Sequence, residues 1–175
     1  MRKVVFGCAN SLDNRIARED GAVDWLMWGK EAAALMTEFW KTVDTILMGR
    51  KTYEVGRKLA KGKNPYAHIK TYVFSRTLPA DGAPGAEIVS SDAAGFVREL
   101  KAADGGDICM MGGGELARTF FEAGLIDEIG FNIHPVLLGR GVPLFLDMDV
   151  QVNLELVESR PFENGCVYVY YRVLR

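Results

Sequence analysis

The sequence predicts an α/β domain whose sheet is mostly parallel and has an antiparallel edge. The first observation is an alternation up to Gly124, in which short apolar runs are followed by segments with apolar residues every three or four positions. The second is the change after Gly124, where three strand-like segments follow one another without a helix. Strands that alternate with helices form parallel sheets, whereas consecutive strands pair antiparallel.

The alternating part is expected to contain the parallel strands and the helices that connect them. Its strands are predicted at 2–11, 43–49, 71–75, 87–90 and 107–112. Its helices are predicted at 28–43, 51–60, 91–103 and 115–124. Ser91 or Asp92 is expected to cap the third helix, because both side chains accept hydrogen bonds from the first helical amides, and Gly124 is expected to end the fourth.

The first predicted helix has one apolar face that is expected to pack on the sheet. The residues at helical spacing on this face are Ala33, Met36, Phe39, Trp40 and Val43. Three tryptophans lie in or near this helix, Trp25, Trp28 and Trp40. They either wall a pocket for a flat ring or pack in the core, and both interpretations stay open.

The last part of the chain is expected to form the antiparallel edge. Strands are predicted at 127–138, 153–162 and 166–174, and the sequence ENG between the last two is typical of a hairpin turn. The turn-rich loops at 61–66 and 78–85 are too short to link domains. Residues 1–175 are therefore predicted to form a single domain.

Charge and hydropathy exclude two classes of partner. The chain has 21 basic and 23 acidic residues, a net charge of -2, and so lacks the basic excess of a surface that binds nucleic acid. No stretch approaches the roughly 20 apolar residues of a membrane span, and the apolar run near Met1 is too short for a signal peptide. A cytoplasmic protein whose partner is a small molecule is expected.

Cysteine and histidine usage argues against a metal site or a disulfide framework. Cys8, Cys109 and Cys166 are odd in number and lie far apart in strand-like apolar stretches, which is typical of buried thiols. His68 and His134 each stand alone, whereas a zinc site needs clustered ligands. His134 is expected to be a packed or surface histidine, and no metal is predicted.

Three predicted strand ends are followed by segments that can bind an anion. In open α/β sheets ligands bind at the carboxyl ends of strands, and each of these segments combines a turn residue with cations, hydroxyls or the free amides of a helix start. The candidate residues are Gly49, Arg50, Lys51, Thr52, Ser75, Arg76, Thr77, Gly112, Gly113, Gly114 and Glu115. Each segment alone is equally a turn or a solvated face, but three at successive strand ends favour a dinucleotide phosphate.

These segments resemble a known family. The stretches ILMGRKTYE, VFSRT and CMMGGGELARTFF are similar, in order and spacing, to the cofactor-binding segments of dihydrofolate reductase. The stretches ANSLDNRIA and LIDEIGFNIHPVLLGRGVPLF resemble the reductase domain of riboflavin biosynthesis and its stand-alone relatives. The resemblance covers nearly the whole chain, and it implies a dihydrofolate-reductase-like three-layer fold, with helices on both faces of a mixed sheet, and NADPH as cofactor.

The resemblance also implies roles for the candidate residues. It assigns residues 49–52 to the cofactor phosphates, and it assigns Ser75 and Arg76 to the adenosine 2′-phosphate, which favours NADPH over NADH. It places residues 112–114 beside the diphosphate, in a turn that contains a cis peptide bond in dihydrofolate reductases. Glycine suits such a turn, because a cis bond and a close backbone approach both favour residues without Cβ.

The proton donor stays open. By spacing, the acid on the first helix of dihydrofolate reductase corresponds to Ala33, so Glu31 and Glu38 are the nearest carboxylates, and their spacing equally suits a solvated helix face. Asp13 is the other candidate, because the resemblance places it beside the nicotinamide and the substrate. Asp13 and Asn14 could equally do no more than close a turn, and water is a third source of the proton.

The expected function is NADPH-dependent reduction of a C=N or C=O carbon in a small heterocyclic or ribosylamino-pyrimidine substrate. This resembles 5-amino-6-(5-phosphoribosylamino)uracil reductase, although the H-x-E and P-C-x-x-C signature of its usual deaminase partner is missing. A dihydrofolate or pterin reductase, a nucleotide- or flavin-binding module without turnover, and a purely structural domain stay open. Because relatives of the riboflavin type pair, a homodimer through the aromatic strand at 166–174 is expected.

Overall fold

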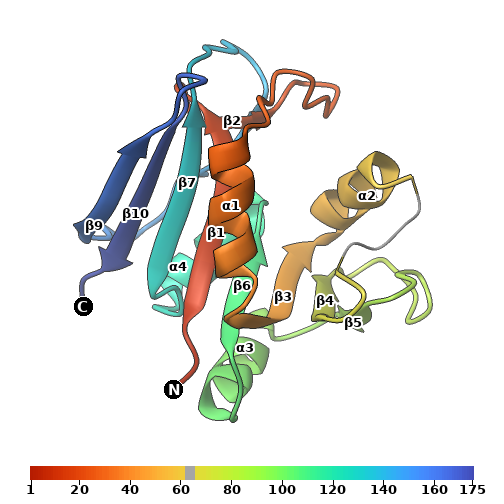
Figure 1. The fold of residues 1–175 in the computed structure, drawn as a ribbon. Coiled ribbons are helices and arrows are strands. Elements are labelled where there is room, and N and C mark those ends of the chain that lie inside the picture. Colours follow the sequence, from red (N-terminus) through yellow and green to blue (C-terminus); the bar gives the residue numbers. More distant parts are fainter. Residues whose placement is uncertain (62–65) are drawn as a thin grey trace.

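An eight-stranded sheet forms the centre of the fold in a computed structural model that describes residues 1–61 and 66–175 (Figure 1). In chain order its strands are β1 (Val4–Ser11), β3 (Val43–Gly49), β4 (Lys70–Phe74), β5 (Glu87–Val89), β6 (Asp107–Met111), β7 (Glu128–His134), β9 (Leu154–Pro161) and β10 (Val167–Val173). Their order across the sheet is β5-β4-β3-β6-β1-β7-β10-β9. Neighbours are parallel from β5 to β7, and β10 is antiparallel to both β7 and β9. The predicted fold class is confirmed.

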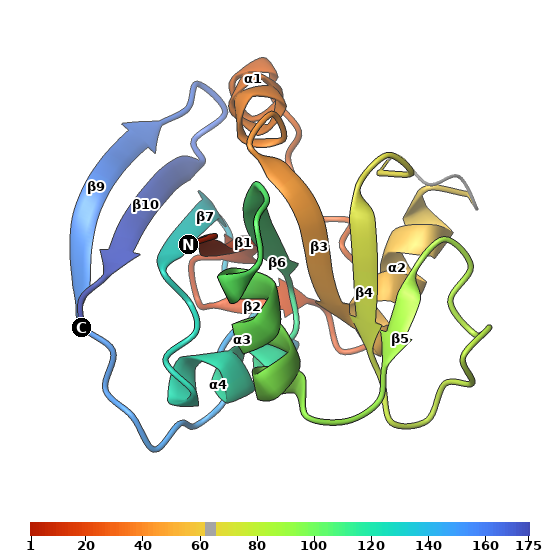
Figure 2. The same cartoon turned by 90° about the horizontal axis from the view of Figure 1, so that it is seen from below.

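Helices cover both faces of the sheet, as the resemblance implied. The helices are α1 (Lys30–Phe39), α2 (Arg50–Leu59), α3 (Ala93–Ala102) and α4 (Gly114–Glu122). Seen from below, α1 lies on one side of the sheet and α3 and α4 on the other (Figure 2). Tyr53 of α2 packs in the same apolar cluster as Phe39 of α1, so these two helices share a face. None of the described helices is long and apolar enough to cross a membrane.

The larger core lies between the sheet and the pair α3 and α4. Phe6 at the centre of β1 is fully buried and meets the rings of Phe121, Phe131 and Phe145 edge-on, with centroids 5.3–6.2 Å apart. Phe120 of α4 is also fully buried in this cluster. The alternating apolar residues of β1 and the apolar stripe of α4 thus face each other, which explains the periodicity of both segments.

Predicted helix and hairpin ends are confirmed. Asp92 caps α3, and its Oδ1 accepts a hydrogen bond from the Gly95 amide at 2.9 Å. Gly124 ends α4 with a φ of 63°, and Gly165 has a φ of 86° in the turn between β9 and β10. The second, two-stranded sheet was not predicted; it pairs β2 (Arg15–Ala17) with β8 (Val142–Pro143). Strands of three and two residues are too short to show a hydrophobic period.

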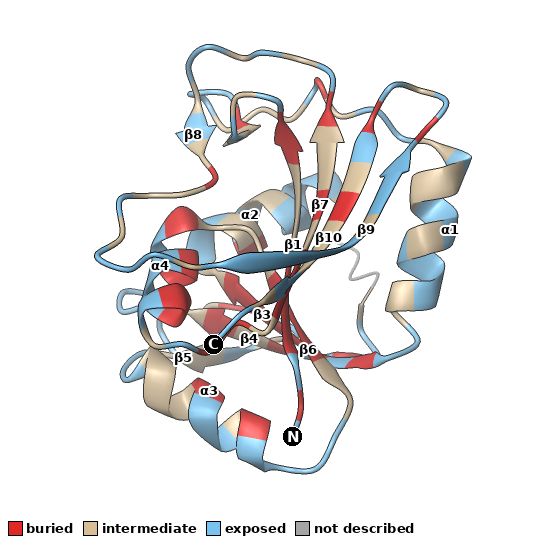
Figure 3. Ribbon diagram, turned by 90° about the vertical axis from the view of Figure 1, so that its left-hand side faces the viewer, coloured by how far each residue is buried: buried red, intermediate tan, exposed pale blue. Residues whose placement is uncertain are grey.

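The prediction that the apolar face of α1 packs on the sheet is wrong. Phe39 is half-buried, but Ala33 and Met36 are exposed, and Val43 lies in β3 instead. Figure 3 shows that α1 carries no buried residue. The reason lies in the sheet, because a Cβ added at Gly7 of β1 would meet nothing within 4 Å. Open space therefore lies beside the middle of β1, on the face opposite Phe6.

Candidate functional site

The register of the parallel strands brings the three predicted segments to one edge of the sheet. Gly49, the last residue of β3, pairs with Phe74, the last residue of β4. Met48 pairs with Met111, the last residue of β6. The segments that start at 49, 75 and 112 therefore leave the sheet side by side, at the carboxyl ends where α/β proteins bind ligands.

A hydrogen bond joins the first segment to the second. Nη1 of Arg50 donates to Oγ1 of Thr77 at 3.0 Å. The hydroxyl of Ser75 accepts hydrogen bonds from the amides of Thr77 and Leu78 at 3.3 and 3.1 Å, which shapes the second segment into a tight turn. The side chain of Arg76, in this turn, is exposed.

A close approach joins the first segment to the glycine turn. Gly112 and Gly113 have φ values of 55° and 82°, which side chains rarely adopt. A Cβ on Gly112 would lie 2.9 Å from Oγ1 of Thr52, in the first turn of α2. Gly114 is buried, and a Cβ there would press on Leu146 at 3.1 Å. Each of the three glycines is thus required by geometry.

The prediction of a cis peptide bond in this turn, which the resemblance implied, is wrong. The described residues contain no cis peptide bond. The left-handed φ values of Gly112 and Gly113 turn the chain instead, so the absence of Cβ serves the turn and the contact with Thr52.

Both helices that start at this edge leave their first amides without a side-chain cap. The N-cap residues are Gly49 for α2 and Gly113 for α4, and neither has a side chain that could accept a hydrogen bond. Free amides at a helix start attract an anion. Glu115 is exposed in the first turn of α4, so it would contribute its backbone amide rather than its carboxylate.

The residues at this edge fit the phosphates of a dinucleotide. The exposed cations Arg50, Lys51 and Arg76 surround two uncapped helix starts, and the glycine turn lets a ligand approach the main chain. Arginine pairs well with phosphate through its planar fork of donors. All the predicted cofactor residues therefore lie at one edge, on three segments of which the first contacts both others.

Asp13 lies in the turn after β1 and holds a distant loop. Its carboxylate accepts hydrogen bonds from the hydroxyl of Ser11 and from the amides of Leu138 and Gly139, the latter at 3.1 and 2.8 Å. The hydrogen bond from Ser11, followed by that from Leu138, lowers the pKa of Asp13 to about 2. Asn14 has a φ of 57°, as expected in a turn. These contacts support the turn-closing interpretation, and the catalytic one stays a prediction.

We expect Asp13→Asn to lower the melting temperature at neutral pH. The folded-state pKa of Asp13 lies below its unfolded value of about 3.9, so its contribution is present above pH 4 and is lost as the pH falls toward about 2. The difference in melting temperature between the wild type and Asp13→Asn should therefore narrow over that range. A difference that is the same at pH 3 as at pH 7, within about one degree, would show that the charge of Asp13 does not hold the loop.

The other catalytic candidate, Glu31, joins α1 to the hairpin turn. Its Oε2 accepts a hydrogen bond from the amide of Glu163 at 3.0 Å. Glu38 pairs with Lys41 on the exposed surface. Ala33, the position that corresponds to the acid of dihydrofolate reductase, is itself exposed. The structure thus gives Glu31 a contact that ties two elements, and its catalytic role also stays a prediction.

A buried polar cluster lies between the end of β7 and the segment before α1. The rings of Trp25 and His134 meet edge-on, with centroids 5.2 Å apart, and both residues are buried. Nδ1 of His134 lies 3.0 Å from the carbonyl oxygen of Asn132 and donates to it. Among the described residues, three polar atoms of this cluster are buried without a hydrogen-bond partner, namely Trp25 Nε1, Asn132 Oδ1 and His134 Nε2.

This polar cluster adjoins the open space beside Gly7. Asn132 pairs with Ala9, which is two residues after Gly7 on the same face of β1. Gly7 in turn pairs with Met111, the residue before the glycine turn. Asn132 was not predicted as a site residue, because its partners in the cluster lie far from it in sequence or form no motif with it. Only two features of the sequence indicated this cluster, namely His134 before Pro135 and Trp25 outside any predicted strand.

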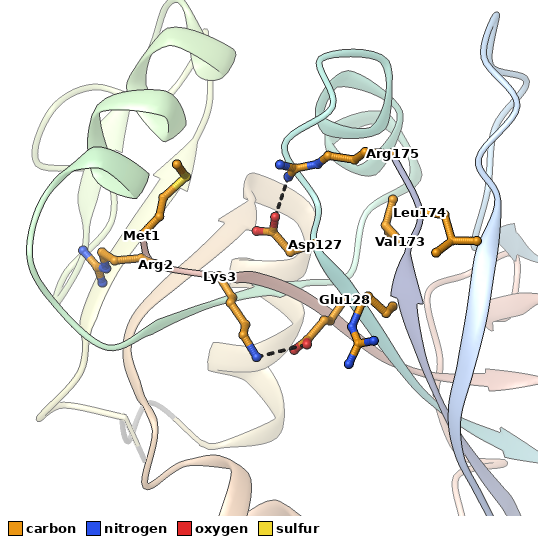
Figure 4. A pocket seen from close by; sticks show the side chains of 9 residues that line it. Met1, Arg2, Lys3, Asp127, Glu128, Val173, Leu174 and Arg175 are labelled. Carbon is orange, nitrogen blue, oxygen red and sulfur yellow. Dashed lines mark hydrogen bonds and ion pairs between the residues drawn. The ribbon is translucent and has the colours of Figure 1, made fainter.

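A separate hollow of about 480 Å³ lies at the opposite, amino-terminal edge of the sheet (Figure 4). Its charged side chains are already paired, Lys3 with Glu128 at 3.1 Å and Arg175 with Asp127 at 2.5 Å. Arg172 pairs with Glu155. None of the predicted site residues lines this hollow, so we do not assign the candidate site to it.

The cysteines do not contribute to the site. All three are free thiols, and burial raises the pKa of Cys109 to about 12, so that it stays protonated. The described part of the chain contains no group of three or more His, Cys, Asp or Glu side chains that could hold a metal ion.

Comparison with known proteins relates this chain to the family that its sequence motifs resemble. The model of the family described as the RibD C-terminal domain matches residues 2–168. The Bacillus subtilis protein YyaP is 36% identical over 97% of this chain and 94% of its own length. The riboflavin biosynthesis protein RibD of Mycobacterium tuberculosis is 30% identical over 84% of this chain, and the match spans 46% of RibD.

Two solved structures share the fold. A diaminohydroxyphosphoribosylaminopyrimidine deaminase/5-amino-6-(5-phosphoribosylamino)uracil reductase of Thermotoga maritima matches with a TM-score of 0.74 and 19% identity, over 99% of this chain and 57% of that one. Dihydrofolate reductase of Enterococcus faecalis, in complex with NADP(H) and RAB-propyl, matches with a TM-score of 0.70 and 19% identity, over 99% and 97%. Together with the match of the family model to nearly every residue, the sequence identity to RibD shows that this chain belongs to the RibD C-terminal domain family.

Proposed function

We propose that this chain is an NADPH-dependent reductase of a small heterocyclic or ribosylamino-pyrimidine substrate. The observation that carries the proposal is the meeting of three anion-binding segments at one edge of the sheet, through the Arg50–Thr77 hydrogen bond and the contact between Thr52 and Gly112. The family supports the same conclusion, because the chain is related to reductases of riboflavin biosynthesis. A solved protein of the same fold is a complex with NADP(H).

The chain's own residues bind and orient the cofactor in this proposal. Arg50 and Lys51 neutralise its diphosphate together with the free amides at the start of α2, and the glycine turn at 112–114 lets the diphosphate approach the main chain. Arg76, exposed in its tight turn, binds the adenosine 2′-phosphate. When bound, NADPH supplies a hydride to an electrophilic carbon of the substrate.

The substrate lies beside Gly7 in this proposal, in the open space between β1 and α1. The absence of a side chain at Gly7 admits a flat ring, and the next polar groups along the sheet belong to the buried cluster around Asn132. A pterin reductase would need an acid on α1, but Ala33 stands at that position and Glu31 is held by the Glu163 amide. The geometry therefore favours a pyrimidine-type substrate over a pterin.

Titration with NADPH and, separately, with NADH tests the proposal. Tryptophan fluorescence and melting temperature report binding, and we expect both signals with NADPH at lower concentration than with NADH. Loss of NADPH absorbance on addition of a ribosylamino-pyrimidine would then establish turnover. Tight NADPH binding with no turnover on pyrimidine, pterin or flavin substrates would support the binding-module alternative, and no response to either nucleotide would overturn the proposal.

Arg76→Ala is expected to remove the preference for NADPH. A charge-assisted hydrogen bond to a phosphate contributes about 1.5–3 kcal/mol, so the affinity for NADPH should fall about tenfold or more. The affinity for NADH, which has no 2′-phosphate, should stay within about twofold of the wild type. Equal losses for the two nucleotides would contradict the assignment of Arg76 to the 2′-phosphate.

We also propose that the protein is cytoplasmic and forms a homodimer through its carboxyl-terminal strands. The aromatic strand β10, through which the dimer was expected, lies between β7 and β9, so the edge strand is β9, most of which is exposed (Figure 3). Leu154, Leu156 and Val157 in this strand are 41–55% exposed, which is unfavourable in water unless a partner covers them. Light scattering should give twice the chain mass of 19.4 kDa, and Leu156→Lys should shift it to the monomer. A monomeric wild-type mass would refute the dimer.

A further inference from the structure

The cations of this protein are unevenly neutralised. Over much of the surface they stand beside carboxylates, as in the pairs Lys41–Glu38, Lys70–Glu87, Arg160–Glu158 and Arg172–Glu155. In contrast, five exposed cations in or near α2 form no ion pair with a described residue, namely Lys51, Arg57, Lys58, Lys61 and Arg76. Residues 62–65 contain no Asp or Glu that could pair with them.

The remaining unpaired cations of the described chain are not concentrated in one part of the molecule. The other cations without an ion pair among the described residues lie singly on different elements and loops, at Arg15, Lys30, Arg98, Arg118 and Arg140. α2 carries four cations and only one carboxylate, Glu54, which is 3.2 Å from Nε of Arg50. In a chain whose net charge is -2, a helix of this composition produces a local positive field.

Stabilisation of the helix explains only part of the pattern. Arg57 and Lys58 lie in the last turn of α2, where cations interact favourably with the helix dipole. Arg57 also lies over the ring of Tyr53, with 5.9 Å between its Cζ and the ring centroid. Arg50 and Lys51, however, lie in the first turn, which contains no acid, and there the dipole disfavours cations. A charge pattern that opposes the dipole at one end of the helix requires another explanation.

The cations of α2 are continuous with the candidate cofactor site. Thr52 in the first turn contacts the glycine turn, and Arg50 is bonded to Thr77 in the segment that carries Arg76. Arg57 and Lys58 follow Arg50 by seven and eight residues, which is about 10–12 Å along a helix. They are therefore too far along α2 to belong to the same phosphate contacts, but they lie within about one to two Debye lengths of them at physiological salt.

We propose that Arg57, Lys58 and Lys61 form a capture surface that speeds the approach of a multiply phosphorylated dinucleotide without contacting it in the bound state. This inference rests on the proposed function. This protein has a net negative charge, which by itself repels NADPH. A local positive field beside the site attracts the phosphates and so raises the rate of association. Because these residues do not contact the bound cofactor, we expect them to change the association rate, and the affinity by the same factor, and to leave the dissociation rate unchanged.

The double variant Arg57→Gln/Lys58→Gln tests this surface. The control is Lys30→Gln/Arg98→Gln, which removes the same charge from two exposed cations on other elements that also lack an ion pair. Stopped-flow fluorescence would give the association and dissociation rates of NADPH. The salt range would run from about 0.01 M to about 1 M, over which the Debye length falls from about 30 to about 3 Å.

At low salt we expect the association rate of the α2 variant to fall roughly three- to tenfold below the wild type, with an unchanged dissociation rate. The difference should disappear at high salt, and the control should stay within about twofold of the wild type. An unchanged association rate, or an equal fall in the control, would overturn the capture surface. A change confined to dissociation would also overturn it, by showing direct contact. Absence of NADPH binding in the wild type at every salt concentration would instead overturn the proposed function and this inference with it.

Discussion

Gly112→Ala is expected to lower the affinity for NADPH at least tenfold, which corresponds to about 1.4 kcal/mol. The new Cβ would lie 2.9 Å from Oγ1 of Thr52, so either the glycine turn or the start of α2 must move. Both segments belong to the proposed phosphate site. The left-handed φ of 55° adds a strain of about 1–2 kcal/mol for a residue with a side chain, and the free energy of unfolding should fall by a similar amount. Nucleotide titration and urea denaturation measure the two effects.

Gly56→Ala is the matched control for Gly112→Ala. Gly56 lies within α2, and a Cβ there would meet nothing within 4 Å. Alanine is favoured over glycine inside a helix by about 0.5–1 kcal/mol, so Gly56→Ala should be slightly more stable than the wild type and should bind NADPH equally well. If Gly112→Ala bound NADPH with wild-type affinity, the glycine turn would not be part of the cofactor site.

Asp127→Ala is expected to reduce the free energy of unfolding by about 3–5 kcal/mol, because it leaves a buried cation without its carboxylate. Lys101 is 5% exposed, and its ammonium group donates to Asp127 and to the carbonyl of Leu125 at 2.9 Å. Asp127 also accepts a hydrogen bond from the Val4 amide at 2.8 Å, where β1 begins. Urea denaturation would measure the loss. NADPH affinity should be unchanged, since Asp127 lies at the opposite edge of the sheet from the three segments.

The double variant Lys101→Met/Asp127→Ala separates the buried charge from the rest of the effect. Removal of the ammonium group relieves the cost of burying it alone, so the double variant should be more stable than Asp127→Ala. A double variant that is less stable than Asp127→Ala would show that Lys101 contributes mainly through packing and through its bond to Leu125. The Lys101–Asp127 ion pair would then contribute less to the free energy of unfolding than expected.

Local period and local chemistry account for what the sequence could predict. The strands and helices around Gly49 and Gly112 were predicted because apolar spacing distinguishes a strand from a helix, and because glycine after a strand indicates a turn. The same reasoning identified the three candidate anion-binding segments, each of which is continuous in sequence. Their meeting at one edge also followed from the alternation of strands and helices, since parallel strands have their carboxyl ends together.

Contacts between distant residues account for what could not be predicted. Helical spacing identified a shared face on α1, but it could not reveal that Gly7 leaves open space opposite that face. The buried polar cluster combines Trp25 with Asn132 and His134, which come from two segments far apart in sequence. The turn at Gly112 was predicted as a site for glycine, yet its left-handed φ and its contact with Thr52 are properties of the folded chain.

The weak packing of α1 has a consequence for local stability. The helix buries no residue, and it is held at its two ends, by the bond from the Glu163 amide to Glu31 and by the half-buried rings of Phe39 and Trp40. By contrast, α4 buries Phe120 and Phe121 in the main core. The free energy of opening a segment depends on the apolar surface it buries, so amide hydrogens of α1 should exchange with solvent well before those of α4. The helix beside the proposed substrate site is therefore expected to open more readily than α4, and a ring bound there should slow the exchange of its amides.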